Sequence, residues 1–179
     1  MIHFLDSSAL VKRYIEEEGS AVIALLFRGR KTLAVSRLAE VEVPLALARR
    51  ARKGDLSERL ARAHGESMLA DLKGMRVVEL RQRTLERART LGWDHGLRAS
   101  DALQLASASR LKTETGMSLT FWSADDGLNS AARLEGLRVG LLGSSTFERR
   151  CINSPPPEAE QHLRARHRVS DRRKAISCP

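Results

Sequence analysis

Cysteine, aromatic residues and long apolar runs are all scarce in this chain of 179 residues. Its two cysteines, Cys151 and Cys178, fit neither a disulfide framework nor a zinc site with paired Cys spacing. Aromatic residues make up 4% of the sequence, so few stacking platforms for single-stranded bases are expected. No apolar stretch is long enough to span a membrane, and His3, Asp6 and Lys12 interrupt the amino terminus where a signal peptide would be apolar. We therefore expect a soluble, cytoplasmic protein without a membrane partner.

Positive charge is abundant and unevenly distributed. The formal net charge is +9 and the isoelectric point is about 10.5. The segment from residue 149 onward holds eight Lys or Arg and three Asp or Glu, so it carries +5 of that total. A polyanionic partner such as nucleic acid is one explanation, because bases that neutralise phosphates release counterions. Arginines that only keep the protein soluble are the other, and composition does not separate the two.

Short apolar segments alternate with amphipathic ones along most of the chain, and no hairpin signal joins them. The apolar segments predict strands at residues 2–5, 33–36, 75–80, 118–123 and 137–142. The intervening segments predict helices, among them 8–19 closed by Gly19, a helix through Leu26 that Ser20 caps, and another that ends at Gly54. Asp55 and Glu58 have the spacing of a capping box for a helix running toward Lys73. Such alternation predicts an α/β fold, a three-layer α/β/α sandwich with a mostly parallel central sheet of about five strands.

The chain divides into a predicted domain, residues 1–143, and an extension, residues 144–179. The alternating pattern ends after Gly143, where the Pro-rich stretch NSPPPEAE begins a polar and basic tail with few core residues. We expect this extension to be poorly ordered, with at most a short helix near residues 158–168.

Four acidic residues stand where a site in a parallel sheet is expected. Asp6 directly follows the first predicted strand and Asp125 the fourth, and ligands bind beyond the carboxyl ends of parallel strands. Asp101 lies in the first turn of a helix, and Glu42 lies in the apolar stretch VEVPLALA. The three aspartates equally suit helix caps, whereas Glu42 gains nothing from capping and requires a cation or solvent.

Bringing these carboxylates together would require a positive charge. Two unit charges about 4 Å apart repel by roughly 4 kcal/mol at an effective dielectric constant of about 20. Oxygen ligands without His or Cys suit a hard cation, so Mg²⁺ is the expected metal and Mn²⁺ its usual substitute.

Four segments follow one another along the chain: FLDSSALVKRYIEEEGS, SRLAEVEVPLALARR, LRASDALQLASA and WSADDGLNSAARLEGLRV, and together they cover roughly residues 1–143. In this order and near the usual spacing, they resemble PIN-domain ribonucleases, specifically VapC-like toxins of type II toxin–antitoxin systems. The family's four acids fall on Asp6, Glu42, Asp101 and Asp125. In the second segment the family spacing selects Glu42 over Glu40.

The resemblance implies a metal-dependent endoribonuclease that hydrolyses RNA phosphodiester bonds. In it Asp6, Asp101 and Asp125 would hold one or two Mg²⁺, and Glu42 would ligate the metal or orient the attacking water. The hydroxyls of Ser7, Ser8 and Ser123 would hydrogen-bond to the carboxylates. Ser7 or Ser8 would cap the helix in place of Asp6. The resemblance further implies toxin dimerisation and a VapB-like antitoxin that folds onto the toxin and obstructs the metal site.

Other functional classes fit less well. A haloacid-dehalogenase-type phosphohydrolase requires a second acid where Ser8 stands, and a response-regulator receiver requires a phosphoacceptor Asp where Arg81 follows the third strand. No GxGxxG, Walker A, GxSxG or HExxH motif occurs. The open alternative is a PIN-like domain that binds RNA or a partner without cutting.

Pro44 adds one local expectation: it cannot donate to the Glu40 carbonyl, so its helix begins near Glu40 or kinks there.

Overall fold

The structure, a computed structural model, describes residues 1–29 and 31–143. Residues 144–179 lie outside the described residues, and with them the predictions of an extension and of a helix near 158–168. Within the described part, no helix is both long enough and apolar enough to cross a membrane.

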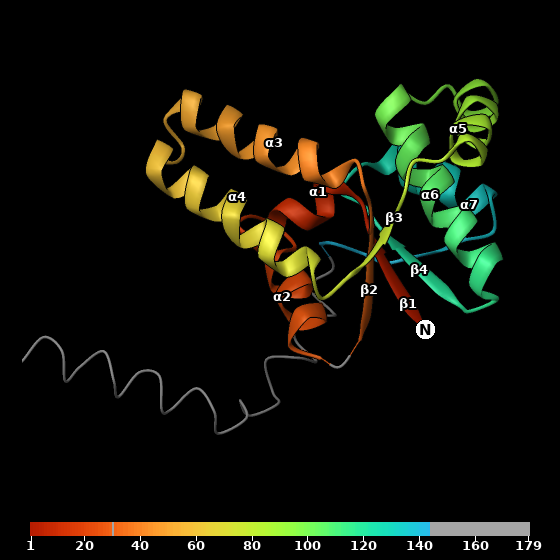
Figure 1. The fold of residues 1–179 in the computed structure, drawn as a ribbon, viewed down its shortest axis with the longest axis horizontal. Helices are drawn as coiled ribbons and strands as arrows, with labels where there is room; N and C mark the ends of the chain where they lie inside the picture. Colours follow the sequence, from red (N-terminus) through yellow and green to blue (C-terminus); the bar gives the residue numbers. More distant parts are fainter. Residues whose placement is uncertain (30, 144–179) are drawn as a thin grey trace, which may run out of the picture. The chain divides into compact units, whose positions relative to one another are not determined.

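A five-stranded parallel sheet forms the centre of the protein (Figure 1), which confirms the predicted fold class. The strand order is β3-β2-β1-β4-β5, and every neighbouring pair is parallel. The bounds are β1 Ile2–Leu5, β2 Thr32–Ser36, β3 Arg76–Val78, β4 Leu119–Trp122 and β5 Arg138–Val139. Because β1 and β4 are neighbours in register, with Leu5 beside Trp122, the residues that follow these two strands meet at one edge.

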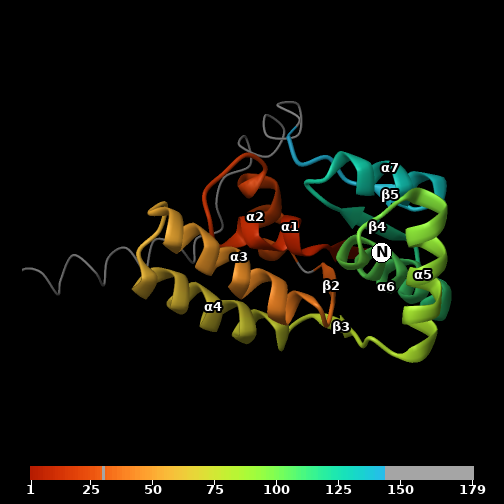
Figure 2. The same cartoon turned by 90° about the horizontal axis from the view of Figure 1, so that it is seen from above.

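Helices cover both faces of the sheet (Figure 2), as the alternating sequence pattern predicted. One face carries the short η1 segment and four α-helices: α1 Ser7–Leu10, η1 Val11–Arg13, α2 Ser20–Arg28, α3 Ala39–Lys53 and α4 Glu58–Leu72. The other carries α5 Gln82–His95, α6 Ala99–Thr115 and α7 Asp126–Leu134. Helix α3 begins at Ala39, one of the two outcomes expected from Pro44.

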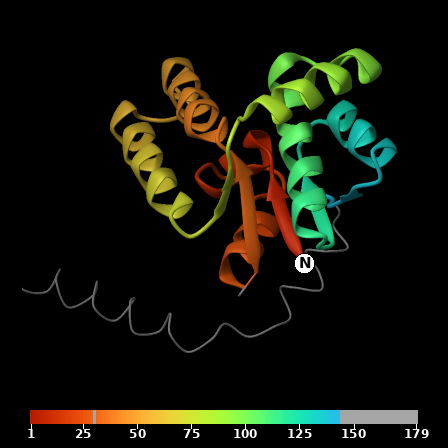
Figure 3. The same ribbon diagram turned by 45° about the vertical axis from the view of Figure 1, so that its right-hand side comes forward.

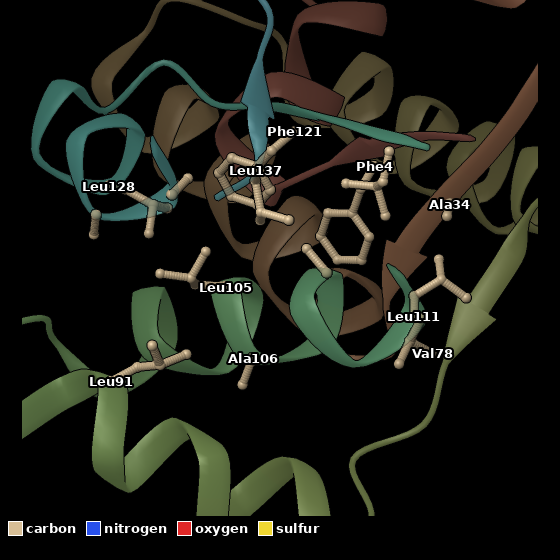
Figure 4. Close-up of a cluster of buried hydrophobic side chains, with 14 of the residues drawn as sticks. Phe4, Ala34, Val78, Leu91, Leu105, Ala106, Leu111, Phe121, Leu128 and Leu137 are labelled. Atoms are coloured by element: carbon tan, nitrogen blue, oxygen red, sulfur yellow. The ribbon is translucent and has the colours of Figure 1, made fainter. Parts of the chain in front are cut away.

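Strand residues alternate between two apolar clusters, one on each face of the sheet. Phe4 and Phe121 stack at 5.8 Å between ring centroids and face Leu105 of α6 and Leu91 of α5 (Figure 4). Leu5 belongs to the opposite cluster, against α1 to α4. Because both faces of the sheet are covered, every residue of β1 and of β4 is buried, and most of these residues are apolar.

The helix predicted over residues 8–19 is wrong in length. The structure has α1 and the short η1 segment, then turns from Tyr14 to Gly19. Buried Lys12 pairs with Glu17 at 2.8 Å, and Arg50 of α3 donates to the same carboxylate at 2.5 Å. These ion pairs stabilise a turn that local helix propensity did not predict.

Two predicted helix caps are also wrong. Ser20 lies inside α2, after Gly19 at φ 85°, and its Oγ accepts from Glu17 N and donates to the Ile15 carbonyl. Ser57, rather than Asp55, caps α4, and its Oγ accepts from Leu60 N. At α4 a serine two positions after the expected cap satisfies the backbone, whereas at α2 the Ser20 hydroxyl bonds to the preceding turn and does not cap the helix.

Candidate metal centre

The candidate site lies at the carboxyl edge of the sheet, beyond the ends of β1 and β4. Figure 3 shows β1 running from the amino terminus toward α1, between α3 on one side and α6 on the other. The site draws its side chains from α1, α3 and α6, and from the loop after β4. Residues far apart in the sequence meet here because β1, at the middle of the sheet, has helices packed on both sides.

Asp6 is the most buried of the four candidate acids, with 4% of its surface exposed. Its Oδ1 accepts from Ala9 N at 2.7 Å, so Asp6 itself caps α1, and the expectation that Ser7 or Ser8 would take over capping is wrong. Ser8 donates to Oδ1 at 2.7 Å and Ser123 to Oδ2 at 2.8 Å. Burial, with a smaller contribution from the charge of the nearby Glu42, raises the pKa of Asp6 to about 6 despite these donors.

Asp101 lies in the first turn of α6 and is half-buried. Its pKa is raised, first by burial and then by the charges of Asp125 and Glu42, while Ser100 and Arg98 act in the opposite direction. Because the charges of Asp125 and Glu42 raise the pKa of Asp101, Asp101 is electrostatically coupled to these two acids.

Glu42 projects from the first turns of α3 and is held from outside its own helix. Its Oε2 accepts from Ser7 Oγ at 2.5 Å and from Gln104 Nε2 at 2.8 Å. Glu40, two residues earlier, is instead paired with Arg37. The two glutamates therefore lie in different surroundings, and only Glu42 faces Asp6 and Asp101 across a cavity.

Asp125 does not line the cavity shared by Asp6, Glu42 and Asp101, although its charge acts on Asp101. It is exposed, and its Oδ1 caps α7 by accepting from Leu128 N at 2.7 Å. Its backbone N–H donates to Ser123 Oγ at 3.0 Å, and Ser123 in turn donates to Asp6. Asp125 is therefore linked to Asp6 through one hydroxyl, although it does not line the cavity that the other acids share.

A cavity of about 570 Å³, here called the acidic cavity, joins three of the four acids. Asp6, Glu42 and Asp101 line it together with Ser7, Ser8, Gln104 and Arg49. In the described part of the chain, no group of three or more His, Cys, Asp or Glu side chains is arranged so that it could hold a metal ion as it stands. Each carboxylate instead turns to its own hydrogen-bond donors. The donor set itself fits a hard cation, since it offers carboxylate oxygens whose mutual repulsion a divalent ion would relieve.

Gln104 and Arg49 are among the cavity-lining residues that the sequence analysis did not predict. Gln104 is buried, with 2% of its surface exposed, and donates to Glu42. Arg49 is exposed and lines the cavity seven positions after Glu42 on α3. Both residues lie at a helical spacing from a predicted acid. Gln104 follows Asp101 by three residues on α6 and Arg49 follows Glu42 by seven on α3, so each lies on the same side of its helix as that acid.

Known proteins resemble most of this chain. The family model described as PIN domain matches residues 3–134. Ribonuclease VapC45 of Mycobacterium tuberculosis (strain CDC 1551 / Oshkosh) is 35% identical over 144 residues, covering 76% of this chain and 92% of that protein. The solved structure of PAE2754 from Pyrobaculum aerophilum has a TM-score of 0.56 at 22% identity, covering 78% of this chain and 83% of that one. VapBC2 from Rickettsia felis, bound to a DNA fragment from its promoter, has a TM-score of 0.53 at 16% identity, covering 78% and 98%. These two structures share the fold described above.

Proposed function

Because the chain belongs to the PIN domain family, we propose that it is a divalent-metal-dependent endoribonuclease and the toxin of a toxin–antitoxin pair. The observation that carries the proposal is the acidic cavity, where Asp6, Glu42 and Asp101 line one space at the carboxyl edge of a parallel sheet. The similarity to Ribonuclease VapC45, over most of both chains, supports RNA as the substrate class.

The four acids have distinct tasks in this proposal. Asp6, Asp101 and Asp125 hold Mg²⁺, with Mn²⁺ as a substitute, and Glu42 ligates it or orients the attacking water. The bound metal supplies a water of lowered pKa and neutralises negative charge on the phosphate oxygens. Ser8 and Ser123 hold the Asp6 carboxylate through charge-assisted hydrogen bonds, which keeps one ligand in place before metal binds.

Arg49 supplies a contact for RNA at the edge of the acidic cavity. Its side chain is exposed, and no ion pair involving it occurs within residues 1–29 and 31–143. The neighbouring Arg50, by contrast, is paired with Glu17 and Asp55. Arg49 is therefore available to bind a phosphate beside the scissile one, with a guanidinium suited to two phosphate oxygens.

A VapB-like antitoxin is the proposed protein partner. Helices α3 and α4 form an apolar groove of about 730 Å³, here called the α3/α4 groove. Leu45 and Leu69 line it with 50% and 49% of their surfaces exposed. Leu45 also lines the acidic cavity, so the groove and the acidic cavity adjoin at this residue. A homodimer of this chain stays a prediction.

The test is cleavage of a mixed RNA pool by the purified protein in Mg²⁺ or in EDTA. Asp101→Asn should lower the rate at least about 100-fold, since groups that only orient a metal ligand already contribute up to about that much. Asp126→Asn is the matched control, because Asp126 lines a different cavity. Cleavage that requires Mg²⁺ and is lost only in Asp101→Asn supports the proposal. RNA binding without cleavage under any condition favours the non-catalytic alternative, and cleavage that survives Asp101→Asn contradicts the assignment of the acids.

A further inference from the structure

Three polar side chains from three helices form a closed set of hydrogen bonds at the acidic cavity. Gln104 Nε2 of α6 donates to Glu42 Oε2 and to Ser7 Oγ, each at 2.8 Å. Ser7 Oγ of α1 donates to the same Glu42 Oε2 at 2.5 Å. One carboxylate oxygen of Glu42 therefore receives two donors from elements 35 and 62 positions away in the sequence.

A glutamine is an unfavourable residue at the buried position 104 unless its amide acts on Glu42. The side chain is 2% exposed on a stretch of α6 where Leu105 and Ala106 are also buried. In the part of the chain that the structure describes, its Oε1 is buried without a hydrogen-bond partner. A buried unpaired amide oxygen costs about 1–3 kcal/mol, so the residue does not serve packing alone. The opposite amide orientation would place that oxygen against the Glu42 carboxylate, two acceptors facing each other.

Among the described residues, the hydrogen bonds to the Glu42 carboxylate come from α1 and α6, and none comes from its own helix α3. No side chain caps the start of α3 at Leu38, and Pro44 cannot donate to the carbonyl of Glu40. Among the described residues Glu42 Oε1 has no hydrogen-bond partner, whereas Oε2 has two. Two donors therefore hold one oxygen of a carboxylate that lines the acidic cavity, and the other oxygen is free of protein donors among the described residues.

We propose that Gln104, with Ser7, is a positioning residue that orients the Glu42 carboxylate toward the metal held by the other acids. The inference rests on the proposed function and deepens it, since it assigns a role to a residue outside the four acids. Partners that orient a ligand in this way typically contribute about 10–100-fold to metal affinity or activity.

The test compares Gln104→Met with Ser107→Ala. Methionine keeps the length of the side chain and removes both the oxygen and the nitrogen of the amide. Ser107 is also buried on α6 but is bonded to Ser36 and the Leu103 carbonyl, away from the acids. Mn²⁺ affinity is measured by calorimetry without RNA, alongside kcat, KM and thermal unfolding. Gln104→Met should weaken Mn²⁺ binding about 10–100-fold and lower kcat with KM for RNA nearly unchanged. Its melting temperature should stay level or rise, because the unpaired oxygen is gone.

A double-mutant cycle separates positioning from a general structural role. If Gln104 acts through Glu42, Gln104→Met has no further effect on Mn²⁺ affinity when Glu42→Gln is already present. Ser7→Ala should reproduce the loss and Ser7→Thr, which keeps the hydroxyl, should restore most of it. Unchanged Mn²⁺ affinity and kcat in Gln104→Met, or equal losses in Ser107→Ala, overturn the inference. A wild-type protein that binds no Mn²⁺ overturns the proposed function itself, which the variants alone would not show.

Discussion

Ser123 and Asp6 lie 117 positions apart in the sequence, yet Ser123 Oγ donates to Asp6 Oδ2 at 2.8 Å. The contact follows from the parallel pairing of β1 with β4, which places the residues after each strand side by side. The same hydroxyl accepts from Asp125 N at 3.0 Å. Ser123 therefore connects the acid after β1 to the acid after β4, and the sheet register determines the distance between them.

The cluster of acids should make the metal-free protein less stable at neutral pH than at mildly acidic pH. The pKa of Asp6 is about 6 in the folded protein and 3.8 as its ordinary value. The folded state thus binds this proton more tightly, so the Asp6 contribution to stability is lost as pH rises from about 4 to about 6. A shift of this size corresponds to roughly 3 kcal/mol. Urea unfolding in EDTA at several pH values measures it.

Added Mg²⁺ should restore the stability that the metal-free protein loses at neutral pH, and the Asp101→Asn variant should regain less of it. The pKa of Asp101 is also raised, mainly by burial and by Asp125, so removing its charge should raise the melting temperature of the metal-free protein at pH 7.5. The same variant should gain less from added Mg²⁺, because a ligand is missing. A variant that is less stable than wild type in EDTA but gains equally from Mg²⁺ would contradict this account.

Arg49→Glu should weaken RNA binding without disturbing the chemistry. Loss of one phosphate contact and the gain of a negative charge should raise KM about 10-fold or more while kcat changes little. Arg52→Glu is the matched control, because Arg52 is an exposed arginine of α3 that lines the α3/α4 groove instead of the acidic cavity. Steady-state kinetics at two salt concentrations measure the effect. Equal KM values for the two variants would remove Arg49 from the RNA contact.

Leu69→Asp should weaken antitoxin binding and leave RNA cleavage unchanged. A charge in the middle of the α3/α4 groove would have to be desolvated when a partner covers it, which should cost at least about 10-fold in affinity. Leu85→Asp is the control, since Leu85 is 40% exposed on α5, outside the groove. Binding is measured with an antitoxin co-expressed with the protein. Full binding by Leu69→Asp would move the partner surface elsewhere.

The fold could be predicted from sequence because its signals are local, whereas much of the site depends on distant contacts. Strand segments such as 2–5 and 118–123 are rich in apolar residues, and the acids that follow them can be located in the sequence. The turn at Glu17 was missed because its carboxylate pairs with Arg50, 33 positions away. Gln104 was missed because its partner Glu42 is 62 positions away. Neither pairing leaves a periodic pattern in the sequence.

The contact between His3 and Trp122 should give the protein a second pH dependence, opposite in sign to that of Asp6. Trp122 Nε1 donates to His3 Nδ1 at 3.1 Å, which requires that nitrogen to be unprotonated. Burial lowers the pKa of His3, and the charge of Lys31 lowers it further. A histidine whose pKa is depressed in the folded protein contributes stability that is fully present above pH 6.5 and is lost as the pH falls below that value. His3→Asn places a non-titrating acceptor near the Nδ1 position, so its stability should decline less than that of wild type between pH 7 and pH 5. Parallel decline of the two proteins over this range would show that His3 does not titrate with folding.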